Sequence, residues 1–246
     1  MNLILDLNVL LPALLAGLLV LATHVPLGQE VLKRGIVFID LAIAQVAVLG
    51  VIAAEVLGFE AHGWAVQVIA ASAALTGAAL LSYAERRFAA QQEALIGALF
   101  VLAASAALLL LHGHPHGAEH FKNILEGQIL WTDIKTLPPV ALLYAVVLVL
   151  WFGARQRFGR AGFYFLFALT VTASVQLVGV YLVFASLIIP ALAASRLAYA
   201  YALGALAYAA GLALSLGADL PAAPVIVCLL AVLGAAVWRF APSVRR

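Results

Sequence analysis

The stretch KRGIVFIDLAIAQVAVLGVIAAEVL, residues 33–57, decides the fold of this chain. It opens with the basic pair Lys33 and Arg34 and continues as an apolar run from Ile36 to Leu57. That run has the length of roughly 20 residues that a helix needs to cross a bilayer core. Similar runs, separated by short charged connections, follow one another along the whole chain. The pattern predicts an all-α polytopic membrane protein.

The composition supports this prediction. Hydrophobic residues make up 66% of the 246 residues and charged residues 10%, far from the usage of soluble domains. The net charge of +2 comes without a basic stripe interleaved with aromatic residues, so we expect no nucleic-acid partner. Cys228 is the single cysteine, which excludes an intramolecular disulfide. We therefore expect the lipid bilayer to be the main surrounding of the chain.

The apolar runs predict about eight or nine membrane-spanning helices, two of them short. The run from Phe163 to Ala194 is too long for one crossing, and a break near Val178 and Gly179 gives two short segments, the second containing Pro190. Short, interrupted segments often line a transport path. No linker or composition break divides the chain, so we expect one permease domain over residues 1–246. The predicted spans are Leu3–Thr23, Ile36–Leu57, Trp64–Tyr83, Ala94–Leu111, Leu137–Phe152, Phe163–Leu177, Val180–Ala194, Tyr199–Leu216 and Ala222–Phe240.

The basic residues lie in every second connection between these spans. Cytoplasmic connections attract Lys and Arg, so we assign those connections to the cytoplasm. With nine passes, the N-terminus is then outside and the C-terminus inside. Eleven of the 13 basic residues fall on the assigned cytoplasmic side, namely Lys33, Arg34, Arg86, Arg87, Arg155, Arg157, Arg160, Arg196, Arg239, Arg245 and Arg246, whereas Lys122 and Lys135 fall outside.

Few ionisable residues lie within the predicted spans. Asp40 lies on the second span, Gln45 follows five residues later, and Glu93 opens the fourth span. A carboxylate inside the membrane costs about 2.5 to 3.5 kcal/mol on insertion scales and usually faces water, a partner or an ion. We expect Asp40 and Glu93 to line a transport path. The alternative is that they pair with Arg34 and Arg87 at the cytoplasmic interface.

A histidine-rich segment, HGHPHGAEH, occupies residues 112–120 in a connection assigned to the outside. Neutral imidazole is the commonest zinc ligand, and a short His-rich tract indicates metal capture. The candidate ligands are His112, His114, His116, Glu119 and His120. The glycines and the proline between them disfavour a regular helix at its start, so a solvated, pH-sensitive loop is the alternative. His24 and His62 lie near the ends of predicted spans, where we expect an interfacial position.

The sequence contains no nucleophile triad, no phosphate-binding Gly-rich loop and no redox cysteine pair, so we expect no enzymatic activity. If transport uses ATP, another chain must hydrolyse it. We also expect no cofactor bound by this chain.

Four segments, in this order, resemble the permease subunits of the zinc, manganese and iron class of ABC transporters. They are PLGQEVLKRGIVFIDLAIAQVAVLGV (26–51), EALIG (93–97), ILEGQILW (124–131) and LVGVYLVFASLIIPALAA (177–194). The resemblance implies a homodimeric permease in a bacterial cytoplasmic membrane. It further implies a cytoplasmic ATPase subunit and an extracytoplasmic metal-binding protein as partners, and zinc, manganese or iron as the transported metal.

Three positions depart from the pattern of that family. Gln45 stands where the family has a histidine after the aspartate of the second helix, and Val101 aligns near a second frequent histidine. The family also has a longer connection with a coupling helix where this chain has only Arg155 to Gly162. We therefore hold two hypotheses: a permease subunit of an importer for a divalent metal or metal chelate, and an ATPase-independent carrier or assembly or sensor subunit with the same fold.

Overall fold

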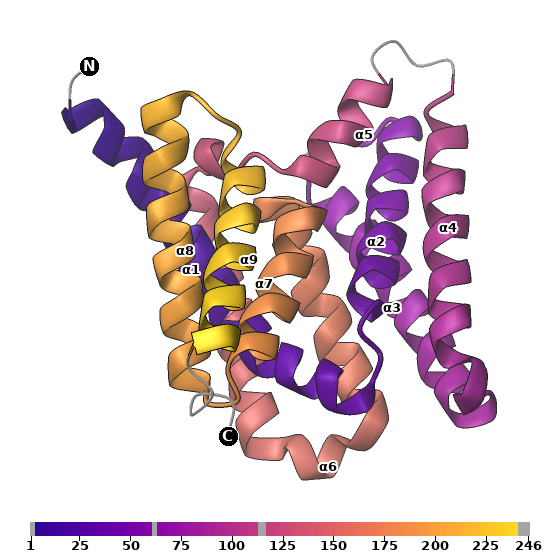
Figure 1. Cartoon of the computed structure of the whole chain (residues 1–246). Helices are drawn as coiled ribbons and strands as arrows, with labels where there is room; N and C mark the ends of the chain where they lie inside the picture. Colours follow the sequence, from indigo (N-terminus) through magenta and orange to yellow (C-terminus); the bar gives the residue numbers. More distant parts are fainter. Residues whose placement is uncertain (1–2, 61–62, 113–116, 241–246) are drawn as a thin grey trace. The chain divides into compact units, whose positions relative to one another are not determined.

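The computed structural model describes residues 3–60, 63–112 and 117–240, with the side chains of 3–7, 118, 120, 154–158, 160 and 240 excepted. Within these ranges the chain is all-helical and contains no strand, which confirms the predicted fold class (Figure 1). The α-helices are α1 (Leu3–Arg34), α2 (Ile39–Val56), α3 (Trp64–Arg87), α4 (Gln92–Leu110), α5 (Gly117–Glu126), α6 (Leu137–Val178), α7 (Val180–Ala193), α8 (Leu197–Ala218) and α9 (Ala222–Phe240). Short 3-10 turns are η1 (Ala89–Gln91), η2 (Ile129–Trp131) and η3 (Ile134–Thr136).

Eight helical segments of the described chain are long and apolar enough to cross a membrane. The helix α7 is also apolar but has 14 residues, which at about 1.5 Å per residue reach only about 21 Å of a hydrocarbon core of about 30 Å. The prediction of about eight or nine spans is confirmed.

The predicted C-terminal end of the first span was wrong. We expected the helix to stop at Thr23, whereas α1 continues through Pro26 to Arg34. Packing explains this, because a Cβ on Gly28 would clash with the carbonyl oxygen of Leu187, so the backbone of α1 lies directly against α7. Neighbouring helices can support a proline inside a membrane helix in this way.

The helix α6 contains two crossings, because its 42 residues would form a rod of about 63 Å if straight. The backbone leaves helical geometry at Gly159, with φ 55° and ψ −148°, and the candidate spans are Ile134–Gly153 and Ala161–Val178. The ring centroids of Trp151 and Phe163 lie 6.0 Å apart, which shows that the chain reverses between them. The connection that we predicted as a loop is therefore a tight helical turn.

The break between α6 and α7 lies at Gly179, as the sequence predicted. Gly179 has φ 82°, and Gly127, in the segment after α5, has φ 73°. The two backbones touch: a Cβ on Gly127 would clash with the carbonyl oxygen of Val178, and a Cβ on Gly179 would clash with the amide nitrogen of Gly127. Only glycine at both positions allows this approach.

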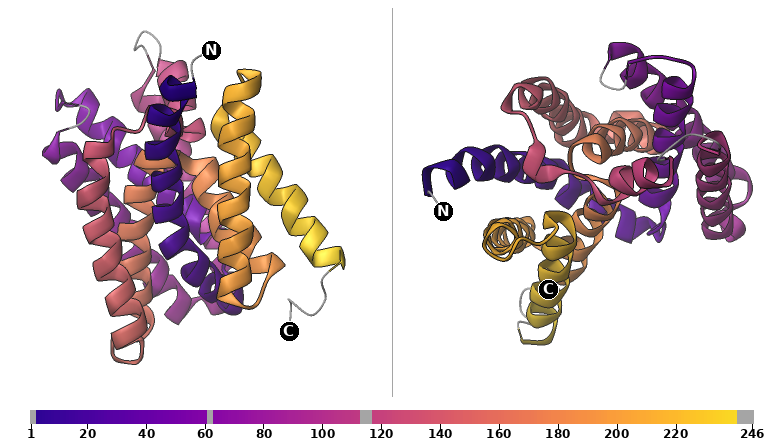
Figure 2. Two further views of the ribbon diagram at one scale, coloured as in Figure 1. Left: turned by 90° about the vertical axis from the view of Figure 1, so that its left-hand side faces the viewer. Right: turned by 90° about the horizontal axis from the view of Figure 1, so that it is seen from above.

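The described chain folds into two compact units, which we call unit 1 (residues 1–35, 125–146 and 174–246) and unit 2 (residues 36–124 and 147–173). In unit 1, α1 contacts α7 and α8, and α9 also contacts both of these helices (Figures 1 and 2). Small residues allow these contacts, since a Cβ on Gly204 would lie 2.6 Å from the Leu21 side chain. In unit 2, α2 packs against both α3 and α4.

Within each unit, basic segments that are far apart in the sequence lie at the same end. In unit 1, Gln29 Nε2 donates a hydrogen bond of 2.7 Å to the carbonyl oxygen of Ser195, which brings the basic end of α1 next to Arg196. In unit 2, Arg86 and Gly162 line the same cavity, so the basic end of α3 lies beside the α6 turn. This distribution supports the predicted orientation of the spans.

Candidate functional site

The helix α2 carries the candidate metal ligands Asp40 and Gln45. Its apolar surface is covered by α3 and α4, and small residues bring the backbones close: a Cβ on Gly50 would lie 2.9 Å from the Cα of Ala70, and one on Gly77 would lie 3.3 Å from Val46. Asp40 lies in the first turn of α2, directly after the short connection from α1. The acid is therefore held on a well-packed helix.

Asp40 is completely buried. Both of its carboxylate oxygens lack a hydrogen-bond partner among the described residues. An ionised carboxylate taken out of water without a partner is strongly unfavourable, so natural proteins keep one there for a cation, a proton or a water-filled path. The buried Asp40 carboxylate is therefore a candidate cation ligand.

The described residues give no support to the interfacial alternative for Asp40. Arg34, the basic residue nearest in sequence, donates from Nε to Glu30 Oε1 at 2.9 Å on its own helix. Asp40 has no ion-pair or hydrogen-bond partner in the described part of the chain. Charge pairing therefore does not explain why an acid is present at this position.

Gln45 is also buried, with 2% of its surface exposed, and its Oε1 has no described hydrogen-bond partner. Five residues of α-helix separate it from Asp40, which corresponds to a rotation of about 140° and a rise of about 7.5 Å. The two oxygens leave α2 in different directions. A cation at Asp40 needs further ligands from water, a chelator or another element.

Glu93 does not share this buried environment, because it lies on the exposed side of the first turn of α4. Its neighbour Gln92 is the buried residue, and Gln92 Nε2 donates to the hydroxyl of Tyr164 at 2.7 Å. The structure thus buries one and exposes the other of two residues that we expected to line one path.

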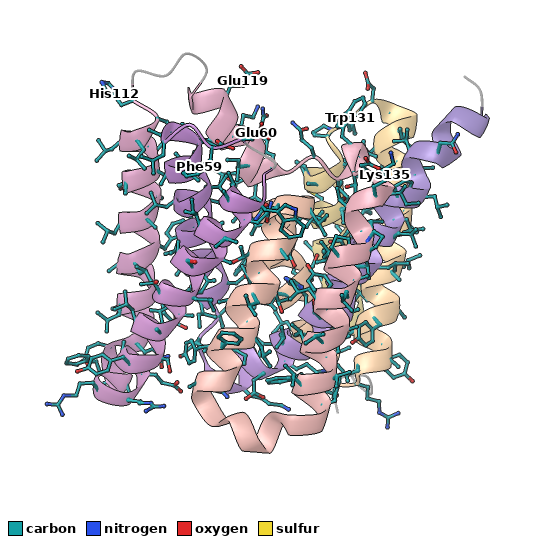
Figure 3. The ribbon with its side chains drawn as sticks, turned by 180° about the vertical axis from the view of Figure 1, so that it is seen from behind. Phe59, Glu60, His112, Glu119, Trp131 and Lys135 are labelled. Atoms are coloured by element: carbon teal, nitrogen blue, oxygen red, sulfur yellow. The ribbon has the colours of Figure 1, made fainter. Side chains whose placement is uncertain are left out.

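His112 and Glu119, both from the histidine-rich segment, lie at the end of unit 2 that also holds Phe59 and Glu60 (Figure 3). His112 and Glu119 are exposed, and α5 begins at Gly117. His114 and His116 lie outside the described residues, as does the side chain of His120. Among the described side chains, no group of three His, Cys, Asp or Glu residues is arranged for a metal ion. Metal capture by this segment stays a prediction.

Unit 1 contains further buried polar residues. Tyr144 and Ser174 share a hydrogen bond of 2.5 Å, and Ser186 and Tyr208 share one of 2.8 Å. His24, expected at an interface, is fully buried, with Nδ1 2.9 Å from the carbonyl oxygen of Val20. Hydroxyl groups in the middle of apolar spans are the signal that marks these positions.

The sequence matches the ABC 3 transport family over residues 6–161 and 152–240. No protein with a curated description matches it significantly.

Two solved structures share the fold. PsaBC from Streptococcus pneumoniae, solved in complex with Fab, superimposes with a TM-score of 0.78 at 22% identity, over 97% of this chain and 95% of that one. A protein described as a metal-chelate type ABC transporter, in an inward-facing conformation, superimposes with a TM-score of 0.65 at 18% identity, over 93% of this chain and 83% of that one. The family match covers almost every described residue, and the apolar helices agree with it. The chain therefore belongs to the ABC 3 transport family and is a multi-pass membrane permease rather than an enzyme.

Proposed function

We propose that this permease imports a divalent metal ion, or a metal chelate, across the bacterial cytoplasmic membrane and that Asp40 contacts the cargo. The observation that carries the proposal is the fully buried Asp40 carboxylate, whose two oxygens have no described hydrogen-bond partner. The similarity in fold to a protein described as a metal-chelate type ABC transporter supports a metal cargo.

The donor atoms favour manganese over zinc. The buried candidates on α2 are a carboxylate oxygen and an amide oxygen, at Asp40 and Gln45. Oxygen ligands suit Mg²⁺, Ca²⁺ and Mn²⁺, whereas imidazole and thiolate suit Zn²⁺ better. Glu93 is exposed in the single chain, so we propose that it takes part where a second chain covers it.

The proposed assembly is a homodimer with a cytoplasmic ATPase subunit and an extracytoplasmic metal-binding protein. We assign the ATPase contact to the turn between the two α6 spans, residues 153–161, where the backbone bends at Gly159. The histidine-rich segment at residues 112–120 is the proposed acceptor of metal on the outer side. The shortness of the α6 turn favours the second hypothesis, in which the same fold works as an ATPase-independent carrier or as an assembly or sensor subunit.

The deciding experiment is uptake of radioactive manganese, iron and zinc into proteoliposomes that contain the permease with its ATPase. We expect uptake that requires ATP, and we expect Asp40→Asn to lower it at least about tenfold, since about 1.4 kcal/mol added to the transport barrier has that effect. The matched control is Asp219→Asn, which neutralises an exposed acid with φ 54°, a backbone conformation that asparagine also adopts.

Each outcome separates the hypotheses. Uptake of Asp40→Asn within twofold of the parent would show that the buried acid is not on the path. Uptake that proceeds without ATP, or a permease that does not copurify with the ATPase, would favour the ATPase-independent carrier. Loss of uptake in Glu93→Gln as well would show that the exposed acid also contacts the cargo.

A further inference from the structure

A cavity of about 640 Å³ lies within unit 2, lined by residues of α3 and α6. Its volume falls in the range of small-molecule sites, about 300 to 1,000 Å³. Leu75, Leu150 and Phe165 are among the apolar residues that line it, and Ser82, Tyr83 and Arg86 line its polar part. The proposed transport function uses none of these residues.

The polar and apolar linings lie at different depths along α3. Leu75 and Arg86 are eleven residues apart on one helix, a rise of about 16 Å. Arg86 lies in the last turn of α3, at the end that the distribution of basic residues assigns to the cytoplasm. The cavity is therefore amphipathic, with a cation at the proposed membrane surface and apolar walls that run toward the membrane interior.

The rim of the cavity is exposed. Tyr83 is 63% exposed and Phe165 is 51% exposed, and both belong to candidate spans. Side chains that are exposed on a span of a membrane protein meet lipid unless another chain covers them. Tyrosine is also enriched at the level of the lipid headgroups. A ligand can therefore enter this cavity from the bilayer.

We propose that this cavity binds one anionic phospholipid of the cytoplasmic leaflet, with its phosphate on Arg86 and one acyl chain along Leu75 and Leu150. Arginine binds phosphate through two parallel hydrogen bonds, and basic pockets between helices on the cytoplasmic side are typical sites for acidic lipid headgroups. The proposal rests on the membrane location of the chain and not on the identity of the transported metal.

Native mass spectrometry of the full-length permease in detergent tests the proposal, with phosphatidylglycerol and phosphatidylcholine of the same acyl chains as probes. We expect one phosphatidylglycerol to bind at least about tenfold more tightly than phosphatidylcholine, because the choline cation of phosphatidylcholine cancels the net negative charge that Arg86 attracts. Excess inorganic phosphate should not displace it, because the acyl chain contributes to binding. Equal affinity for the two lipids, or displacement by phosphate, would overturn the proposal.

Two pairs of variants locate the site. Arg86→Gln should remove the preference for phosphatidylglycerol, whereas Arg87→Gln, the next residue on the same helix and not part of the lining, should keep it. Ala79→Trp should fill the cavity and weaken the binding of both lipids. Leu80→Trp, at the next residue but outside the lining, should weaken the binding of neither lipid. If Arg87→Gln lowered the preference for phosphatidylglycerol as much as Arg86→Gln, the lipid would be attracted to the basic surface in general. That result would overturn the proposal.

A second copy of the chain is the competing occupant of this surface. A cysteine placed at Ala79 in a Cys228→Ala background tests it by cross-linking in membranes with a short thiol reagent. We expect no cross-linked dimer through this position. An efficient cross-link together with no retained lipid would show that the cavity is a subunit interface and would overturn the lipid site.

Discussion

The carboxylate of Asp40 lies in α2 with no exposed surface, and neither of its oxygens has a hydrogen-bond partner in the described part of the chain. Such a group lowers the stability of the fold unless something neutralises it. A cation supplied from outside the chain would remove this cost. Under the proposed function, stability and transport would be coupled at this residue.

This coupling predicts a metal-dependent melting temperature. Manganese at about 100 times its dissociation constant should stabilise the purified permease by about 2.7 kcal/mol, because the ion binds the folded state. Asp40→Asn should lose most of this stabilisation, while Asp219→Asn should keep it. Thermal unfolding followed by intrinsic fluorescence measures both. An equal rise in the melting temperature of the parent and of Asp40→Asn would show that manganese binds elsewhere.

At the scale of elements, the junction of α6 and α7 depends on two glycines. Gly127 and Gly179 both have positive φ and touch through their backbones, although 52 residues separate them. The contact ties the segment before η2 to the point where the long apolar run breaks. The break is thus held by tertiary structure as well as by the local sequence.

Gly179→Ala should destabilise the permease. The residue would need a backbone conformation that costs of order 1 to 3 kcal/mol, and its Cβ would also clash with the backbone of Gly127. The matched control is Gly97→Ala in α4, where a Cβ meets nothing within 4 Å and alanine favours the helix by up to about 1 kcal/mol. Thermal unfolding compares the two. A melting temperature of Gly179→Ala at or above that of Gly97→Ala would contradict the proposed strain.

The histidine-rich segment at residues 112–120 carries a second element-scale prediction. Zinc should bind the full-length permease at about pH 7.5 and bind weakly at about pH 5.5, because imidazole coordinates metal when neutral and histidine ordinarily gains a proton below about pH 6.5. Replacing His112, His114, His116 and His120 with glutamine should remove this binding. Isothermal titration calorimetry measures it. The same zinc affinity in the four-site variant, or at both pH values, would rule out metal capture by this segment.

At the scale of the whole molecule, the distribution of basic residues predicts the orientation in the membrane. With the C-terminus inside, a cysteine at Arg246 in a Cys228→Ala background should resist a membrane-impermeant thiol reagent added to intact cells. A cysteine at Lys122, assigned to the outside, should react. Labelling at position 246 in intact cells would reverse the predicted topology.

Much of the fold could be predicted because insertion into a bilayer depends on local composition. The break at Gly179 and the starts of α3 and α9 agree with the sequence. The end of α1 and the form of the α6 turn differ from the prediction, because each depends on contacts with other segments. The helix α1 continues past Thr23 to where Gly28 packs on α7, and Gly159 reverses the chain within a helical turn.

The candidate site was predictable in part. An acid inside an apolar run marks Asp40 in the sequence alone, but the same reasoning marked Glu93, which the structure leaves exposed. Periodicity does not distinguish the two, because the burial of a side chain in a membrane protein depends on which helices cover it. Their roles as ligands stay predictions that uptake measurements decide.

The sequence by itself determined that the chain is a helical membrane protein, roughly how many spans it has, and which connections carry its positive charge, because hydrophobicity and charge act on each segment separately. Only the tertiary structure decided which polar groups lack partners, where α6 reverses, and how Gly127 meets Gly179. These features arise from contacts between segments far apart in the chain, and the free energy of such contacts depends on their geometry rather than on the composition of either segment.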